Sequence, residues 1–315
     1  MHQYLARRLL VGLLLVFAVS VAVFASMQLI PADAVDIMLG MGRTPEAATA
    51  LRHRLGLDQP PAQRYIGWLA GLLRGDLGQS LITEEPVAEM IRQRLPITIE
   101  LAVLATLIAV VIGVPAGIIA AVRQYSIADQ VSTALSLVGL ALPNFWLGTL
   151  LILAFSITWR LLPPGGVLPR VSEDLLGNLK RMVMPALSMG LPSAAVYFRM
   201  TRSSMLEVIR SDYMLTAYSK GISERRAVLI HALKNGLIPV VTVGGLQITW
   251  MLGGSFIIES IFSLPGLGIA TVGAIFKRDY TVLQGCVLVY SVVVVVVSIG
   301  IDLAYAWLDP RIRYE

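Results

Sequence analysis

The side chains that commonly carry out chemistry are few and scattered in this chain. The three histidines, His2, His53 and His231, lie far apart, and no His, Asp or Glu cluster has metal-ligand spacing. A Gly-x-Ser-x-Gly nucleophile motif does not occur. The dipeptide Gly-Lys, which a phosphate-binding loop needs, does not occur either. We therefore expect no catalytic residue, no metal site, no bound cofactor and no enzymatic activity in this chain.

One polar segment, residues 212–239, stands out between two long apolar runs. Helical spacing suits Asp212–Lys220 and Glu224–Lys234, and Gly221 lies between them. Glycine adopts the left-handed backbone conformation without steric cost, so it marks a break between two helices. We expect two short helices at an angle, with an apolar ridge for contact with a partner. An ordinary basic loop is the alternative that the spacing leaves open.

The composition is that of an integral membrane protein. Of 315 residues, 56% are hydrophobic and 14% are charged, whereas a soluble domain has about 25% charged residues. The net charge of +5 is spread between apolar runs, which argues against a nucleic-acid-binding domain. We expect membrane lipid and no nucleic acid among the partners. The single cysteine, Cys286, excludes a disulfide framework and is interpreted as a packing residue.

Spanning a bilayer takes about 20 apolar residues. Six runs qualify as spans, namely Leu9–Ala32, Leu101–Val122, Gln130–Trp159, Met182–Phe198, Asn235–Ile258 and Tyr280–Ile301. The fourth is short, and we expect Arg199 and Arg202 to extend it by reaching the interface. A seventh run, Ser260–Phe276, contains Pro265-Gly-Leu-Gly268, so we expect a surface or re-entrant turn there. The first run is too long for a signal peptide and predicts an uncleaved span.

The distribution of Lys and Arg predicts that both termini lie in the cytoplasm, because cytoplasmic loops are richer in these residues. With the N-terminus inside, the inner segments hold twelve, namely Arg7, Arg8, Arg123, Arg199, Arg202, Arg210, Lys220, Arg225, Arg226, Lys234, Arg311 and Arg313. The short outer loops hold six, namely Arg160, Arg170, Lys180, Arg181, Lys277 and Arg278.

These patterns divide the chain into four parts. Residues 1–32 form an N-terminal anchor helix, 33–97 an insertion outside the cell membrane, 98–308 a five-helix core and 309–315 a tail. Within the insertion we expect three helices: one starting at Thr44-Pro45-Glu46, one over Tyr65–Leu73, and one over Pro86–Arg94 that lies along the membrane surface before Pro96.

The polar segment resembles the coupling loop of ABC importer permeases, the element that docks onto an ATPase subunit. Its motif, Asp212-Tyr-x-x-Thr-Ala-x-x-Lys-Gly221, is similar to that of the dipeptide/oligopeptide/nickel branch. The more general importer motif is matched at Ala217, Gly221 and Leu233, with departures that are typical of this branch at Leu215, Thr216, His231 and Lys234. Further matches in order along the chain include Leu55-Gly-Leu-Asp-Gln-Pro60, Gly75-Asp-Leu-Gly78, Thr201-Arg-Ser-Ser-Met-Leu206, Pro265-Gly-Leu-Gly268, Arg278-Asp-Tyr280 and Asp309-Pro-Arg-Ile-Arg313.

The resemblance implies an all-α, type I ABC importer permease-like fold with six transmembrane helices and a periplasmic insertion after the first. It implies a bacterial inner-membrane subunit that forms half of a translocation path for short peptides, or for nickel or a nickel–chelator complex. The partners it implies are a second, related permease chain, one or two ATPase subunits that bind ATP and Mg²⁺, and a periplasmic substrate-binding protein. An ion-driven secondary transporter is the alternative from another class, but no internal repeat favours it.

Two sets of site residues follow. The coupling loop, residues 203–235, carries the ATPase-coupling set, namely Asp212, Tyr213, Thr216, Ala217, Lys220, Gly221, Ile222 and Leu233, with Ala217 and Ile222 forming the contact ridge. Candidates for the translocation path are Pro143, Asn144, Phe145, Gly253, Ser255 and Glu259. For Pro143, Asn144 and Phe145, a kink that serves packing alone is an equally open explanation. For Gly253 and Ser255, close helix packing is the more common one.

Overall fold

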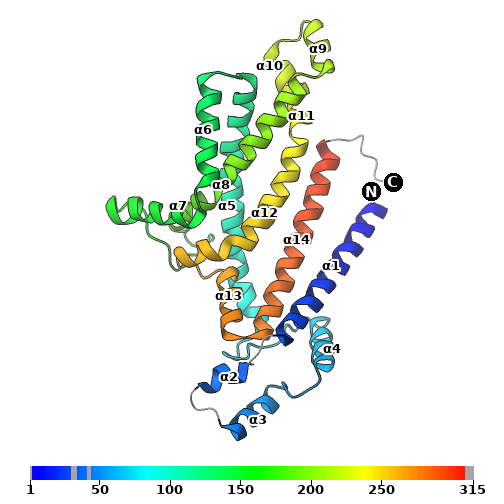
Figure 1. Ribbon diagram of the computed structural model, residues 1–315, viewed down its shortest axis with the longest axis vertical. Coiled ribbons are helices and arrows are strands. Elements are labelled where there is room, and N and C mark those ends of the chain that lie inside the picture. Colours follow the sequence, from blue (N-terminus) through cyan, green and yellow to red (C-terminus); the bar gives the residue numbers. More distant parts are fainter. Residues whose placement is uncertain (1, 30–33, 41–43, 309–315) are drawn as a thin grey trace. The chain divides into compact units, whose positions relative to one another are not determined.

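The computed structural model describes residues 2–29, 34–40 and 44–308, and the regular elements among them are helices (Figure 1). The all-α class is thus confirmed. The chain forms two compact units. One comprises Ile99–Leu264 and the chain from Val296 onward, and the other comprises His2–Thr98 and Pro265–Val295. The predicted tail, 309–315, lies outside the described residues.

The unit that begins at His2 combines several short helices with one whole long helix and parts of two others. Its elements are α1 (His2–Gln28), α2 (Ala34–Leu39), α3 (Pro45–Arg54), α4 (Pro61–Leu72), the start of α5 (Val87–Val122), α13 (Leu267–Lys277) and the first half of α14 (Tyr280–Leu308). Its core combines α5, α13 and α14 through Val87, Ile91, Leu267, Ala274, Val282 and Cys286. Cys286 is 1% exposed, so its interpretation as a packing residue is confirmed.

The helices predicted within the segment 33–97 agree in part with the structure. Thr44 caps α3 by accepting a hydrogen bond from Ala47 N at 3.2 Å, as its sequence predicts. The second helix, α4, starts four residues before the predicted Tyr65 because Pro60-Pro61 forms its N-terminus. The separate surface helix over Pro86–Arg94 is wrong, since α5 runs without a break through Pro96.

The turn between α13 and α14 depends on one carboxylate. Asp279 is 4% exposed and accepts hydrogen bonds from the Ser80 hydroxyl, from Leu81 N at 3.2 Å and from Val282 N at 3.3 Å. It therefore caps the N-terminus of α14 and holds the loop that precedes α5. α13 has 11 residues, so the 260–276 run is too short a helix to cross a bilayer, as expected.

The other unit is organised around α8 (Leu175–Ile209). Its further elements are the rest of α5, α6 (Ile127–Ala141), α7 (Asn144–Leu151), the π-helical segment η2 (Ile152–Thr158), α9 (Asp212–Ser219), α10 (Glu224–Arg226), the π-helical segment η3 (Ala227–Ala232), α11 (Leu233–Gly236), α12 (Ile238–Ile261) and the end of α14. α8 packs against α6, α7 and α12.

Glycines bring α5 into close contact with α8. A Cβ at Gly113 would lie 2.4 Å from Ala194 O, and one at Gly117 would lie 2.8 Å from Phe198 O. The two glycines are four residues apart and so share one face of α5. This spacing allows the two backbones to approach as they do in membrane helix pairs.

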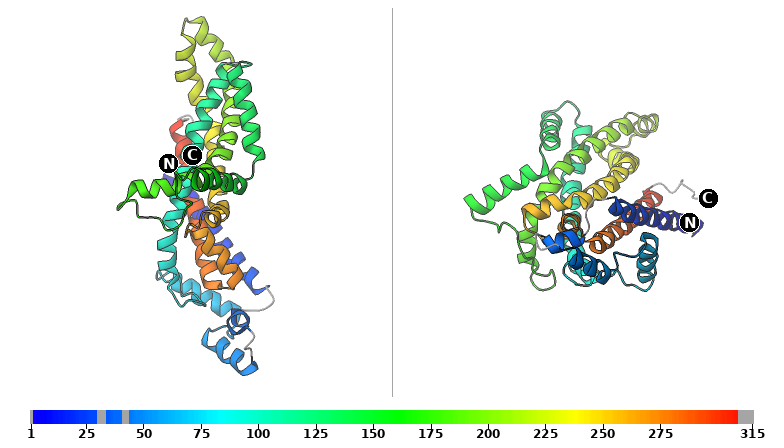
Figure 2. Two further views of the ribbon diagram at one scale, coloured as in Figure 1. Left: turned by 90° about the vertical axis from the view of Figure 1, so that its left-hand side faces the viewer. Right: turned by 60° about the horizontal axis from the view of Figure 1, so that its bottom comes forward.

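Four described helices are long and apolar enough to span a membrane, namely Ala6–Gln28, Val87–Val122, Ile238–Ile261 and Tyr280–Tyr305. The predicted third span is instead broken: α6 and the α7–η2 pair meet at 100°, and α7 runs sideways from α6 (Figures 1 and 2). The fourth predicted span lies within α8, whose 35 residues contain Pro185, Pro192 and several polar side chains. These features keep α8 outside the apolar set although its length is ample.

Candidate functional site

The coupling loop begins as the last turns of α8 and then forms two helical arms. The first arm is α9, and the second combines α10, η3 and α11. Gly221 has a φ of 75° and donates from its N to Tyr218 O at 2.9 Å, while Ile222 N donates to Ala217 O at 3.3 Å. This pair of bonds is a Schellman motif, which ends a helix at a left-handed residue. The predicted break at Gly221 is confirmed, and its cause is the helix cap.

The loop has its own hydrophobic core. Met205, Met214, Ala227 and Ala232 are buried with Ala121 of α5, and Ile222 and Leu233 pack against them. Ala217 is only 8% exposed. The prediction that Ala217 and Ile222 form an outward-facing ridge is therefore wrong. The Schellman motif joins the two residues by a hydrogen bond, and their side chains face this chain's own helices.

Other side chains of the loop point outward. Tyr213 and Leu215 of α9 are 43% and 58% exposed, and Leu229 and Ile230 of η3 are 51% and 54% exposed. Asp212, Thr216, Lys220 and Gly221 are also exposed. A polar segment with four exposed, large apolar side chains has the composition of a protein-contact surface.

Tyr213 joins the two arms of the loop. Its hydroxyl accepts a hydrogen bond from Asn235 Nδ2 at 3.0 Å and donates to His231 O at 3.5 Å. Nearby, burial and then the negative charge of Glu224 raise the pKa of the Tyr218 phenol. A phenol is uncharged at neutral pH even without this shift, and the direction of the shift agrees with the position of Tyr218 against the buried cluster.

The translocation-path candidates at Pro143 lie where α6 bends into α7. Leu142 is extended, with ψ at 122°, because a residue before proline avoids the helical region. Asn144 opens α7, and Phe145 is 51% exposed. The predicted helix bend is confirmed, whereas a role in transport stays a prediction.

The remaining candidates lie on α12. Ser255 and Glu259 are fully buried, and the Ser255 hydroxyl donates to Leu252 O at 3.1 Å. A Cβ at Gly253 would meet no atom within 4 Å, so the close helix contact expected there is not made within this chain. α7 and α12 pack against each other, and Gly148 faces the ring of Phe262. The two candidate groups therefore lie on neighbouring helices.

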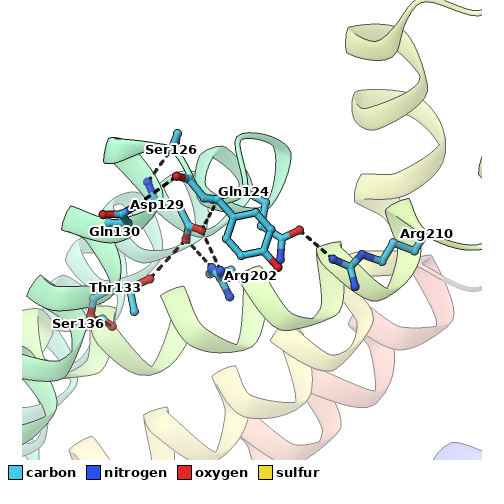
Figure 3. A network of polar contacts seen from close by, with 9 residues as sticks. Gln124, Ser126, Asp129, Gln130, Thr133, Ser136, Arg202 and Arg210 are labelled. Atoms are coloured by element: carbon cyan, nitrogen blue, oxygen red, sulfur yellow. Dashed lines mark hydrogen bonds and ion pairs between the residues drawn. The ribbon is translucent and has the colours of Figure 1, made fainter.

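A polar cluster between α6 and α8 was not predicted (Figure 3). The guanidinium of Arg202 donates two hydrogen bonds to Asp129, from Nε to Oδ1 at 2.6 Å and from a terminal nitrogen to Oδ2 at 2.9 Å. Arg202 therefore pairs with a carboxylate, and its position at the membrane interface stays a prediction. The signal in the sequence is a lone acid, Asp129, directly before the apolar run Gln130–Trp159.

Comparison with known proteins gives a consistent family. Residues 113–314 match the family described as binding-protein-dependent transport system inner membrane component, and residues 1–102 match its N-terminal membrane component. The chain is similar over its full length to curated relatives, whose full lengths are covered as well. It is 38% identical to the dipeptide transport system permease protein of Escherichia coli K12 and 40% identical to the di/tripeptide transport system permease protein of Pseudomonas aeruginosa UCBPP-PA14. A putative peptide transport system permease protein of Brucella abortus 2308 is 38% identical.

Two solved structures share the fold. A chain of the MetNI methionine ABC transporter in an inward-facing conformation gives a TM-score of 0.55 at 16% identity, covering 70% of this chain and 96% of its own. A chain of an amino acid ABC transporter gives 0.52 at 16% identity, covering 68% and 92%.

Proposed function

Because the chain belongs to the family of binding-protein-dependent transport system inner membrane components, we propose that it forms half of a translocation path for short peptides. It is a permease subunit of an ABC importer, with the type I importer fold, and not an enzyme itself. The peptide substrate is supported by full-length relatives at 38–40% identity that are named for dipeptide and di/tripeptide transport.

The main support for coupling to an ATPase is the outward-facing surface of the coupling loop. Tyr213, Leu215, Leu229 and Ile230 are exposed, while the loop behind them is packed on α5 and α8. An ATPase subunit that binds this surface would move the folded coupling loop, which is continuous with α8 and α12. ATP and Mg²⁺ are bound by such ATPase subunits.

Further partners complete the importer. A second, related permease chain supplies the other half of the path, and a periplasmic binding protein delivers the substrate. With the N- and C-termini in the cytoplasm, the coupling loop faces the ATPase, and the segment 33–97 faces the binding protein. Pro143, Asn144, Phe145, Gly253, Ser255 and Glu259 are the residues that we place along the path.

The test is uptake by the reconstituted importer. The permease pair, its ATPase subunits and its binding protein are placed in liposomes with ATP inside, and labelled dipeptides or nickel are supplied outside. Dipeptide uptake that requires ATP supports the proposal. Uptake of nickel without uptake of dipeptides would mean that the substrate is the metal and not a peptide. Uptake driven by an ion gradient without ATP would overturn the mechanism and favour a secondary transporter.

A further inference from the structure

The end of α8 that leads into the coupling loop is joined to α6 by a partly buried ion pair. The side chain of Asp129 is 4% exposed, and that of Arg202 is 27% exposed. The contact is bidentate, with both carboxylate oxygens accepting from one guanidinium. Such a fork fixes orientation as well as distance, which a single charged contact does not.

The same carboxylate also organises the turn between α5 and α6. Asp129 Oδ2 accepts from Tyr125 N at 2.9 Å, and its Oδ1 accepts from the Thr133 hydroxyl at 3.4 Å. Ser126 caps α6 by accepting from Asp129 N at 3.3 Å. Tyr125 itself has a φ of 65°, an uncommon conformation that these bonds hold in place. Asp129 thus links the turn, α6 and α8 at one point.

A second contact is made by a residue within the coupling loop itself. A terminal nitrogen of Arg210, the residue that directly follows α8, donates to Gln124 Oε1 at 2.8 Å (Figure 3). The two contacts are eight residues apart on the same chain segment. Together they fasten the end of α8, from which the coupling loop emerges, to the α5–α6 turn.

Two cavities lie beside the contact between α6 and α8. A cavity of about 340 Å³ is lined by residues of α5, α6 and α8, including Gly113, Ser136 and Ala195. A second cavity, of about 650 Å³, is lined by residues of α6, α8 and α12, including Leu140, Arg199 and Val243. α6 also packs directly on α8, and Arg202 and Thr133 help to line the larger cavity, so the ion pair lies at the border of the packed contact.

We propose that Asp129 and Arg202 are positioning residues that transmit movement of the coupling loop to α6. When an ATPase shifts the loop, the ion pair makes the end of α8 and the α5–α6 turn move as one body. α6 leads directly into the bend at Pro143, so the movement reaches the α7 region. This inference rests on the proposed function of the loop.

The test compares the number of ATP molecules hydrolysed per peptide transported by the complete reconstituted importer. Asp129→Asn keeps the side-chain shape and removes the negative charge, and the double variant Asp129→Asn/Arg202→Gln removes both charges of the ion pair. We expect both variants to retain their ATPase subunits on purification and to hydrolyse severalfold more ATP per peptide than the wild type. Arg202→Lys, which keeps the charge without the fork, is expected to lie in between.

The matched control is Glu173→Gln, which breaks the exposed ion pair of Glu173 with Arg170 and should leave the ratio unchanged. A wild-type ratio in the double variant would overturn the proposal. Absence of the double variant from the membrane would also overturn it, since the pair would then be required for folding. Failure of the proposed function is distinguishable, because the wild-type importer itself would then show no ATP-dependent peptide uptake.

Discussion

The Asn235 side chain donates a hydrogen bond to the Tyr213 hydroxyl across 3.0 Å, and this bond joins the first and last helices of the coupling loop. The two residues are 22 positions apart and lie on α9 and α11. The loop is therefore closed on itself by a polar contact on its outer side, in addition to its buried core.

Removal of this hydroxyl should loosen the loop without unfolding the protein. A hydrogen bond contributes about 0.5–1.5 kcal/mol, so Tyr213→Phe should speed amide hydrogen exchange in residues 212–236 by up to about tenfold. Ser219→Ala is the control, because the Ser219 hydroxyl donates only to Leu215 O within α9. Equal exchange in the two variants would mean that the Tyr213 bond does not join the arms.

Gly221 should be essential for transport and dispensable for insertion. A Cβ there meets no atom within 4 Å, so only the backbone conformation opposes a side chain. The left-handed conformation costs an L-residue about 1–2 kcal/mol. We expect Gly221→Val to reach the membrane at normal abundance and to lose peptide uptake. The control, Ser223→Val, changes an exposed residue of the same turn that has no positive φ. Normal uptake by Gly221→Val would show that the loop end does not need this cap.

Glycine at position 113 should be required for packing of α5 on α8. A Cβ would lie 2.4 Å from Ala194 O, and overpacking costs about 1–3 kcal/mol. Gly113→Ala should therefore lower the thermal midpoint of the purified permease. Gly253→Ala serves as the control because its Cβ enters open space. Equal midpoints would contradict the close approach of the two helices.

Labelling should place the coupling loop in the cytoplasm and the insertion outside. Ser80 is a poor site for an introduced cysteine, since it is 3% exposed and donates to Asp279. Thr83 and Ser223 are both exposed. In intact cells, an impermeant thiol reagent should modify Thr83→Cys and spare Ser223→Cys. The reverse pattern would invert the topology.

The purified chain alone should neither bind nor hydrolyse ATP, because its sequence has no phosphate-binding loop of the Gly-Lys type. Hydrolysis should appear only after the ATPase subunits are added. The measurement is phosphate release by the isolated permease, with the assembled importer as the positive control. Persistent hydrolysis by a contaminant-free permease would refute the expectation.

Features that depend on neighbouring residues were predicted well. Thr44 and Gly221 each act through bonds to residues at most five positions away, so their types alone indicate a helix start and a helix end. The apolar runs likewise located the long helices, except for the third run, which is broken into two helices. Pro143 marked a bend, although its size of 100° depends on packing of α7 against α8 and α12.

Features that depend on distant residues were missed. Asp129 and Arg202 are 73 positions apart, and the sequence around either residue does not indicate its partner. Ala217 was predicted to face outward, but it is only 8% exposed in the folded chain. Pro96 was expected to stop a helix, but Val87 and Ile91 are buried against α13 and α14, and this packing keeps the turns before the proline in line with the rest of α5.

The buried cluster beneath the coupling loop also affects the thermodynamics of assembly. Met214, Ala227 and Ala232 are already packed on Met205 in this chain alone. A segment whose backbone is ordered before its partner arrives loses less conformational entropy on binding, and that loss otherwise weakens an interface. We therefore expect association with an ATPase to resemble docking of two rigid surfaces, with little heat-capacity change beyond that of the buried apolar contact.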